Sequence, residues 1–133
     1  MKAVVYSVME VEKEPIAIAN KKKHDITLVS NPLTDRSINF ARGKRAVVVT
    51  VADIVSEKII EQLAEMGVEY IATRSQDLRH IDLNAARKFE IQIGALTSGS
   101  VATEEQINQY ISIASQVIGH LDNWDKILEK KGH

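Results

Sequence analysis

Cysteine is absent from this chain of 133 residues, so neither a disulfide nor a thiolate site can form, which predicts a reducing, cytoplasmic setting. Long apolar runs are absent as well. None approaches the roughly 18 residues of a membrane-spanning helix, and the first residues have the pattern of a strand rather than of a signal peptide. Neither sign of charge is in excess, because 17 basic residues stand against 18 acidic ones. We therefore expect a cytoplasmic protein that binds neither a membrane nor a nucleic acid.

Glycine and histidine lack the spacings that cofactor and metal sites need. The six glycines never follow the Gly-x-Gly-x-x-Gly spacing of a dinucleotide-binding turn. The segment GALTSGS at 94–100 imitates the spacing of a phosphate loop, but no lysine follows Gly99 to reach a phosphate. The histidines have no metal-ligand spacing and are predicted to be surface residues; they are His24, His80, His120 and His133. These observations predict no bound cofactor and no metal.

What the chain does contain is an alternation of strand and helix patterns. Runs rich in β-branched and apolar residues predict strands at residues 2–8, 25–30, 45–51, 69–73 and 90–96. Helical periodicity and cap signals predict helices at residues 14–23, 33–43, 56–67, 82–89 and 104–120, and an amphipathic segment follows at 123–131. The expected helix caps are Thr34, Ser56, Asp82, and Thr103 in a capping box with Gln106.

This alternation predicts an α/β fold made of parallel βαβ units with right-handed crossovers. The length fits a single domain, residues 1–133. Because the first two strands are close in sequence, we predict a flavodoxin-like three-layer sandwich with a five-stranded parallel sheet in the order 2-1-3-4-5. A ligand of such a sheet lies beyond the carboxyl ends of the strands. That rule selects residues 6–9, 51–53, 74–80 and 96–100.

Two stretches of the chain resemble the D-2-hydroxyacid dehydrogenases, and the D-lactate dehydrogenases most. The first, LTDRSINFARG to FEIQI at 33–93, is similar to their substrate-binding domain, and GVEYIATRS with HIDLNAA is its most specific part. By this resemblance, residues 1–96 match the family's N-terminal segment. Residues 97–133, with ATEEQINQYISIASQVIGHLDNW, are similar to the segment that returns from the nucleotide-binding domain. The resemblance implies a substrate domain whose nucleotide domain has been excised and whose ends have been rejoined.

The resemblance places a carboxylate-binding turn after the fourth strand, and this chain departs from the family there. Backbone N–H groups of that turn cradle the substrate carboxylate in the family. Here Asp77 stands in place of a glycine, and Arg79 and His80 replace a small polar pair. Two alternatives follow: a solvated turn closed by an Asp77–Arg79 or Asp77–His80 contact, or a retained anion site. The candidate ligand-binding residues are Tyr6, Arg74, Ser75, Gln76, Asp77 and Arg79.

The resemblance also implies that the catalytic groups are absent. Hydride transfer in the family needs a nicotinamide cofactor, an arginine and a carboxylate–histidine pair, and most of these belong to the nucleotide domain. Gly99 stands where the family has its histidine, so we predict no catalytic residue. Three functions remain open: a non-catalytic interaction or regulatory module, a binder of a small 2-oxo or 2-hydroxy acid, and a half-enzyme completed by a separate NAD-binding subunit.

A last expectation concerns a surface. The carboxyl edge of this sheet faces the nucleotide domain in the family, so without that domain its apolar residues should be exposed. They are Tyr6, Val8, Met9, Val51, Leu78 and Leu96. A patch of this kind commonly marks an interaction site, which predicts a homodimer or a protein partner at this edge. The alternative is that the loops fold inward and these residues join the core.

Overall fold

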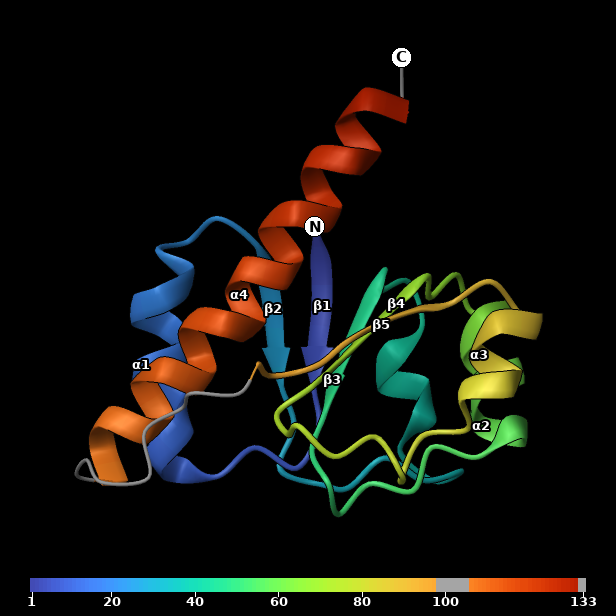
Figure 1. The fold of residues 1–133 in the computed structure, drawn as a ribbon, viewed down its shortest axis with the longest axis horizontal. Helices are drawn as coiled ribbons and strands as arrows, with labels where there is room; N and C mark the ends of the chain where they lie inside the picture. The colour runs from blue at the N-terminus through green and yellow to red at the C-terminus, as the bar shows by residue number, and fades with distance from the viewer. Residues whose placement is uncertain (98–105, 132–133) are drawn as a thin grey trace.

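A computed structural model describes residues 1–97 and 106–131 and contains the predicted parallel sheet (Figure 1). Its five strands run in the order β2-β1-β3-β4-β5, and every pair is parallel. The strands are β1 (Lys2–Val5), β2 (Asp25–Leu28), β3 (Ala46–Val49), β4 (Tyr70–Thr73) and β5 (Gln92–Gly94). The predicted α/β class and strand order are therefore confirmed. Each strand is shorter than its apolar run, because the remaining residues of the run form the loops at the strand ends.

Helices cover both faces of the sheet, which makes three layers (Figure 1). The helices are α1 (Glu10–Asn20), α2 (Glu57–Glu65), α3 (Leu83–Lys88) and α4 (Gln106–Lys131), with a 3₁₀ turn η1 at Ile38–Ala41. Alternation along β1 assigns the faces, because Val4 packs with α2, α3 and η1, whereas Ala3 and Val5 pack with α1 and α4. The strands β3 and β4 are buried throughout, as expected for central strands of a parallel sheet.

Helix boundaries follow the local chemistry. The predicted caps Ser56 and Asp82 are confirmed, since their side chains accept the backbone N–H groups of Ile59 and Ala85. The helix α1 begins earlier than predicted because the carboxylate of Glu12 accepts the Met9 backbone N–H at 2.9 Å. Pro15 therefore lies inside α1.

Two helix predictions were wrong. Residues 33–43 form only the short turn η1. The Ser37 hydroxyl donates a hydrogen bond to the Pro32 carbonyl and accepts one from the Thr34 backbone N–H. These local hydrogen bonds compete with those of a helix. The segments predicted at 104–120 and 123–131 are one helix, α4. Its buried face continues through Leu121 and Trp124, so nothing ends it between the two segments. Thr103 lies outside the described residues.

The surface prediction for the histidines was wrong for His24, whose side chain is 2% exposed. Its Nε2 lies 2.8 Å from the Asp122 carboxylate of α4, and this buried partner is what the sequence pattern did not reveal. His120 is half-buried and stacks on Trp124, which in turn stacks on Tyr70 of β4. His133 lies outside the described residues. Over the residues that the structure describes, no helix is long and apolar enough to cross a membrane.

The contact between β5 and α4 leaves no space for a side chain at Gly94. A Cβ at this position would lie 2.9 Å from Nδ1 of His120. The ring cannot easily retreat, because its Nε2 is 2.9 Å from the Ala95 carbonyl and its face stacks on Trp124. We therefore predict that Gly94→Ala lowers the free energy of unfolding by about 1–3 kcal/mol in urea denaturation.

Gly119→Ala is the matched control for this prediction. Gly119 lies inside α4, and a Cβ there would meet nothing within 4 Å. Alanine should raise the free energy of unfolding by about 0.5–1 kcal/mol because it restricts the unfolded chain and favours the helix. Equal effects of the two substitutions would show that the β5–α4 contact is not as tight as described.

Candidate functional site

The loops at the carboxyl edge of the sheet meet at one buried carboxylate, Asp53. Its Oδ1 accepts the Ser7 hydroxyl at 2.7 Å and the Leu33 backbone N–H at 3.0 Å, and its Oδ2 accepts the Thr50 N–H at 2.9 Å. These donors belong to the loops after β1, β2 and β3, so one side chain of 1% exposure joins all three. Residues 51–53 lie in a stretch that the strand-end rule selects, but the sequence pattern does not reveal this role of Asp53, since the hydrogen-bond donors Ser7 and Leu33 are distant in sequence.

Arg74, the first residue after β4, is held by the interior of the protein. Its Nε lies 2.7 Å and its Nη2 3.2 Å from the Glu12 carboxylate of α1, in a pair whose side chains are 4% and 7% exposed. The guanidinium also donates to the carbonyls of Tyr6 and Ser7, each at 3.0 Å. The backbone of Ser7 is in the left-handed conformation, with φ 54, where its carbonyl accepts this hydrogen bond from Arg74. Arg74 was a candidate ligand residue, and in the structure its guanidinium binds these protein groups.

Tyr6 points into the core rather than toward the edge. Its hydroxyl donates to the Ser37 carbonyl at 2.8 Å, and burial raises the pKa of Tyr6 to about 12. Tyr6 and Val8 are 0% and 5% exposed, so the expectation that they lie on the surface was wrong. The loops fold inward at these two positions because a hydrogen-bond partner and apolar neighbours are available there.

Other apolar residues of this edge do face the solvent. Met9 is 49% and Val51 is 52% exposed, as expected, and Ile54 is 69% exposed although it was not on the predicted list. Leu78 and Leu96 are half-buried. The carboxyl edge therefore keeps exposed apolar side chains on the loops that surround Asp53. Residues 98–100 of the last candidate stretch lie outside the described residues.

The turn after β4 is closed by its own side chains. The Asp77 carboxylate accepts hydrogen bonds from the Arg79 backbone N–H at 2.9 Å and from Nη2 of the Arg79 guanidinium at 2.8 Å. This is the Asp77–Arg79 contact that the solvated-turn alternative predicts. Hydrogen bonds from Arg79 lower the pKa of Asp77 to about 2, so the carboxylate is charged at neutral pH. The Arg79 side chain is 91% exposed. Gln76 is exposed and donates to the Thr97 carbonyl at 3.3 Å.

A chain of hydrogen bonds beneath the turn determines the tautomer of His80. The Ser75 hydroxyl donates to the Asp77 carbonyl at 2.8 Å, so it must accept the hydroxyl of Thr73 at 3.0 Å. Thr73 has then used its proton and must accept from His80 Nε2, also at 3.0 Å. His80 is therefore the Nε2–H tautomer, and its buried Nδ1 has no partner among the described residues. Burial lowers the pKa of His80, and Asp77 and Asp53 offset part of that effect.

The fold and the position of the turn define an α/β domain of the kind that holds a ligand at the carboxyl ends of parallel strands. A family model described as the catalytic domain of D-isomer specific 2-hydroxyacid dehydrogenases matches residues 3–110. The chain belongs to this family.

Individual relatives agree with this assignment. A 2-hydroxyacid dehydrogenase homolog of Haemophilus influenzae is 30% identical over 94 residues, which are 70% of this chain and 28% of that protein. The D-lactate dehydrogenase of Escherichia coli is also 30% identical, over 70% of this chain and 29% of its own length. Its apo structure superposes with a TM-score of 0.70 at 29% identity, covering 72% of this chain and 31% of that one. The chain thus spans less than a third of the length of these relatives.

The Arg74–Glu12 pair generates a stability prediction. Arg74→Met should lower the free energy of unfolding by about 3–5 kcal/mol, because it leaves the Glu12 carboxylate buried without its cation. The double variant Arg74→Met, Glu12→Leu should recover part of this loss, since no charge then remains buried. Urea denaturation of the three proteins gives the comparison, and a double variant as unstable as the single one would contradict the assignment.

His80 predicts a pH dependence. Because burial lowers its folded pKa below the ordinary value of 6.5, the unfolded chain takes up the proton first as the pH falls. The contribution of His80 to stability is complete above pH 6.5 and declines below it. His80→Gln keeps a donor for Thr73 and cannot titrate. Between neutral and mildly acidic pH, the free energy of unfolding of His80→Gln should therefore fall less than that of the native chain. Parallel plots of unfolding free energy against pH for the two proteins would show that His80 does not have a lowered pKa in the folded state.

Proposed function

We propose that this chain is a substrate-domain homologue that does not transfer hydride by itself and acts as a cytoplasmic interaction or regulatory module. The observation that carries the proposal is the Asp77–Arg79 pair. A carboxylate with a pKa of about 2 occupies the turn where an acid ligand would be held, and it already accepts the backbone N–H and the guanidinium of Arg79 that such a ligand would need. Arg74 offers no compensating charge, because its guanidinium is paired with Glu12.

The described residues do not fit a nicotinamide dinucleotide, which supports the same proposal. A pyrophosphate needs a glycine-rich turn at the carboxyl end of a strand. Gly43 and Gly67 line a hollow with Met1 and Lys2, at the opposite edge of the sheet. Gly94 lies against His120, and Gly119 lies within α4. The prediction that Gly99 replaces a catalytic histidine falls outside the described residues and stays a prediction.

A protein partner at the carboxyl edge would give the module its function. Met9, Val51 and Ile54 are exposed there on the loops around Asp53, and Asp53 holds these loops in a fixed arrangement. Exposed apolar side chains on a rigid support are typical of an interaction site.

A second candidate function, the binding of a small 2-oxo or 2-hydroxy acid, is favoured by one feature. The Arg79 guanidinium is exposed on the turn, and only its contact with Asp77 neutralises it among the described residues. Removal of the Asp77 side chain would make this cation available to an anion.

One set of measurements distinguishes the two functions. We expect the purified chain to show no NADH oxidation with pyruvate or glyoxylate and weak binding of either acid in calorimetry. Asp77→Gly should strengthen binding several-fold, since it removes a like charge and allows the backbone N–H groups of the turn to approach an anion.

Asp77→Asn is the matched control, because it removes the charge and keeps the size of the side chain. Its affinity should lie between those of the native chain and the glycine variant. NADH oxidation above the level of a contaminant control would overturn the non-catalytic assignment. Tight binding of an acid by the native chain, weakened in the glycine variant, would make Asp77 a ligand contact and favour the second function.

A further inference from the structure

The helix α4 is much longer than the sheet that it covers. Its 26 residues extend about 39 Å, whereas a strand of four residues extends about 13 Å. The last buried residue of α4 is Trp124, at 6% exposure. Figure 1 shows the end of α4 projecting past the N-terminal end of β1. We call residues 125–130 the distal segment.

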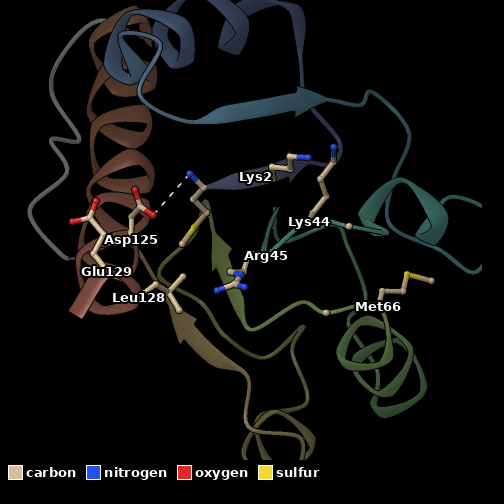
Figure 2. Close-up of a pocket in the computed structure, with 10 residues that line it drawn as sticks. Lys2, Lys44, Arg45, Met66, Asp125, Leu128 and Glu129 are labelled. Carbon is tan, nitrogen blue, oxygen red and sulfur yellow. Dashed lines mark ion pairs between the residues drawn. The ribbon is translucent and has the colours of Figure 1, made fainter. Parts of the chain in front are cut away.

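The distal segment has two faces of different character. Asp125, Leu128 and Glu129 face the amino edge of the sheet, where Asp125 lies 3.9 Å from the amino group of Met1 (Figure 2). The opposite face carries Lys126, Ile127 and Lys130. Ile127 is 39% exposed, and neither lysine is in an ion pair among the described residues. One face is therefore basic with an apolar centre.

A hollow of about 520 Å³ lies beside the distal segment at the same edge, and we call it the acidic hollow. Its apolar lining includes Val68 and Phe89, and Leu128 of the distal segment forms part of its wall. Both charged residues of its lining, Glu69 and Glu90, are acidic. Neither is in an ion pair within the ranges that the structure describes. The two carboxylates of this hollow are opposite in charge to the lysines on the outer face of the distal segment. Lys88, whose Nζ lies 5.4 Å from the centroid of the Phe89 ring, is paired with Glu57.

We propose that the chain forms a two-fold dimer in which the distal segment of each copy occupies the acidic hollow of the other. Ile127 then covers the apolar lining near Phe89. Lys126 and Lys130, one helical turn apart, lie opposite Glu69 and Glu90. Because each copy carries both the segment and the hollow, a two-fold axis forms both contacts at once. Intramolecular insertion is excluded, since the outer face of the segment points away from its own hollow.

This inference goes beyond the proposed function and does not depend on it. The dimer uses the amino edge of the sheet, whereas the turn with Asp77 and the apolar residues around Asp53 lie at the carboxyl edge. A dimer of this form leaves the carboxyl edge of both copies accessible. It would therefore present the same partner surface twice.

Light scattering coupled to size exclusion tests the dimer on the full chain, from low to high micromolar concentration. The native chain should be a dimer at the upper end, and Ile127→Glu should weaken association by about tenfold or more. Lys126→Glu with Lys130→Glu, and Glu69→Lys with Glu90→Lys, should each give monomers. An equal mixture of these two double variants should restore a dimer, because both contacts are then oppositely charged again. Loss of folding cannot produce this rescue.

Ile18→Glu is the matched control, since Ile18 is 62% exposed on α1 and lies outside the acidic hollow. It should leave the dimer intact. A native chain that is monomeric throughout would overturn the proposal, and so would a dimer that survives both charge reversals. A dimer that Ile54→Glu dissociates, while Ile127→Glu does not, would place self-association at the carboxyl edge and also overturn it.

Discussion

The ion pair between Arg74 and Glu12 is the constraint on which the remaining structure depends. It joins the end of a central strand to α1, and the same guanidinium fixes the two carbonyls that follow β1. That geometry directs the Ser7 hydroxyl to Asp53, which assembles the other loops of the carboxyl edge. A buried pair gains little over well-packed apolar residues, but it allows few alternative arrangements when every donor has a partner. In this protein the pair fixes the position of α1 and of the loops at the carboxyl edge.

The sequence pattern predicted the sheet well because the strands and helices themselves carry local signals. β-Branched runs and the helix caps at Ser56 and Asp82 mark alternating strands and helices, and short right-handed connections then leave few topologies, of which the observed order is one. Contacts between distant residues could not be predicted in this way. The burial of His24 depends on Asp122, and the inward orientation of Tyr6 depends on the Ser37 carbonyl. Within the turn, by contrast, the Asp77–Arg79 contact joins near neighbours, and the sequence indicated it as one alternative.

Membership of the 2-hydroxyacid dehydrogenase family indicates the fold of the chain but does not by itself indicate its chemistry. The scaffold of the relatives is retained at a TM-score of 0.70, while the turn after β4 at its carboxyl edge carries a charged pair. A loop on a rigid sheet can change its side chains at little cost to stability, because few of them belong to the core. This separation of scaffold from loop explains how one domain architecture can persist while the side chains of its loops change.

The hydrogen bond between Lys23 and Asp122 spans 99 positions of the sequence, and it belongs to the contact of α4 with the beginning of the chain. Folding must therefore close a loop that includes most of the protein before this layer of the sandwich is complete, and such non-local contacts form slowly. During synthesis on the ribosome, the face of the sheet with Ala3, Val5 and Val48 is covered by α1 alone until α4 has emerged. The layer with α2 and α3 can assemble earlier, so the nascent chain passes through a stage in which one apolar face of the sheet is only partly covered.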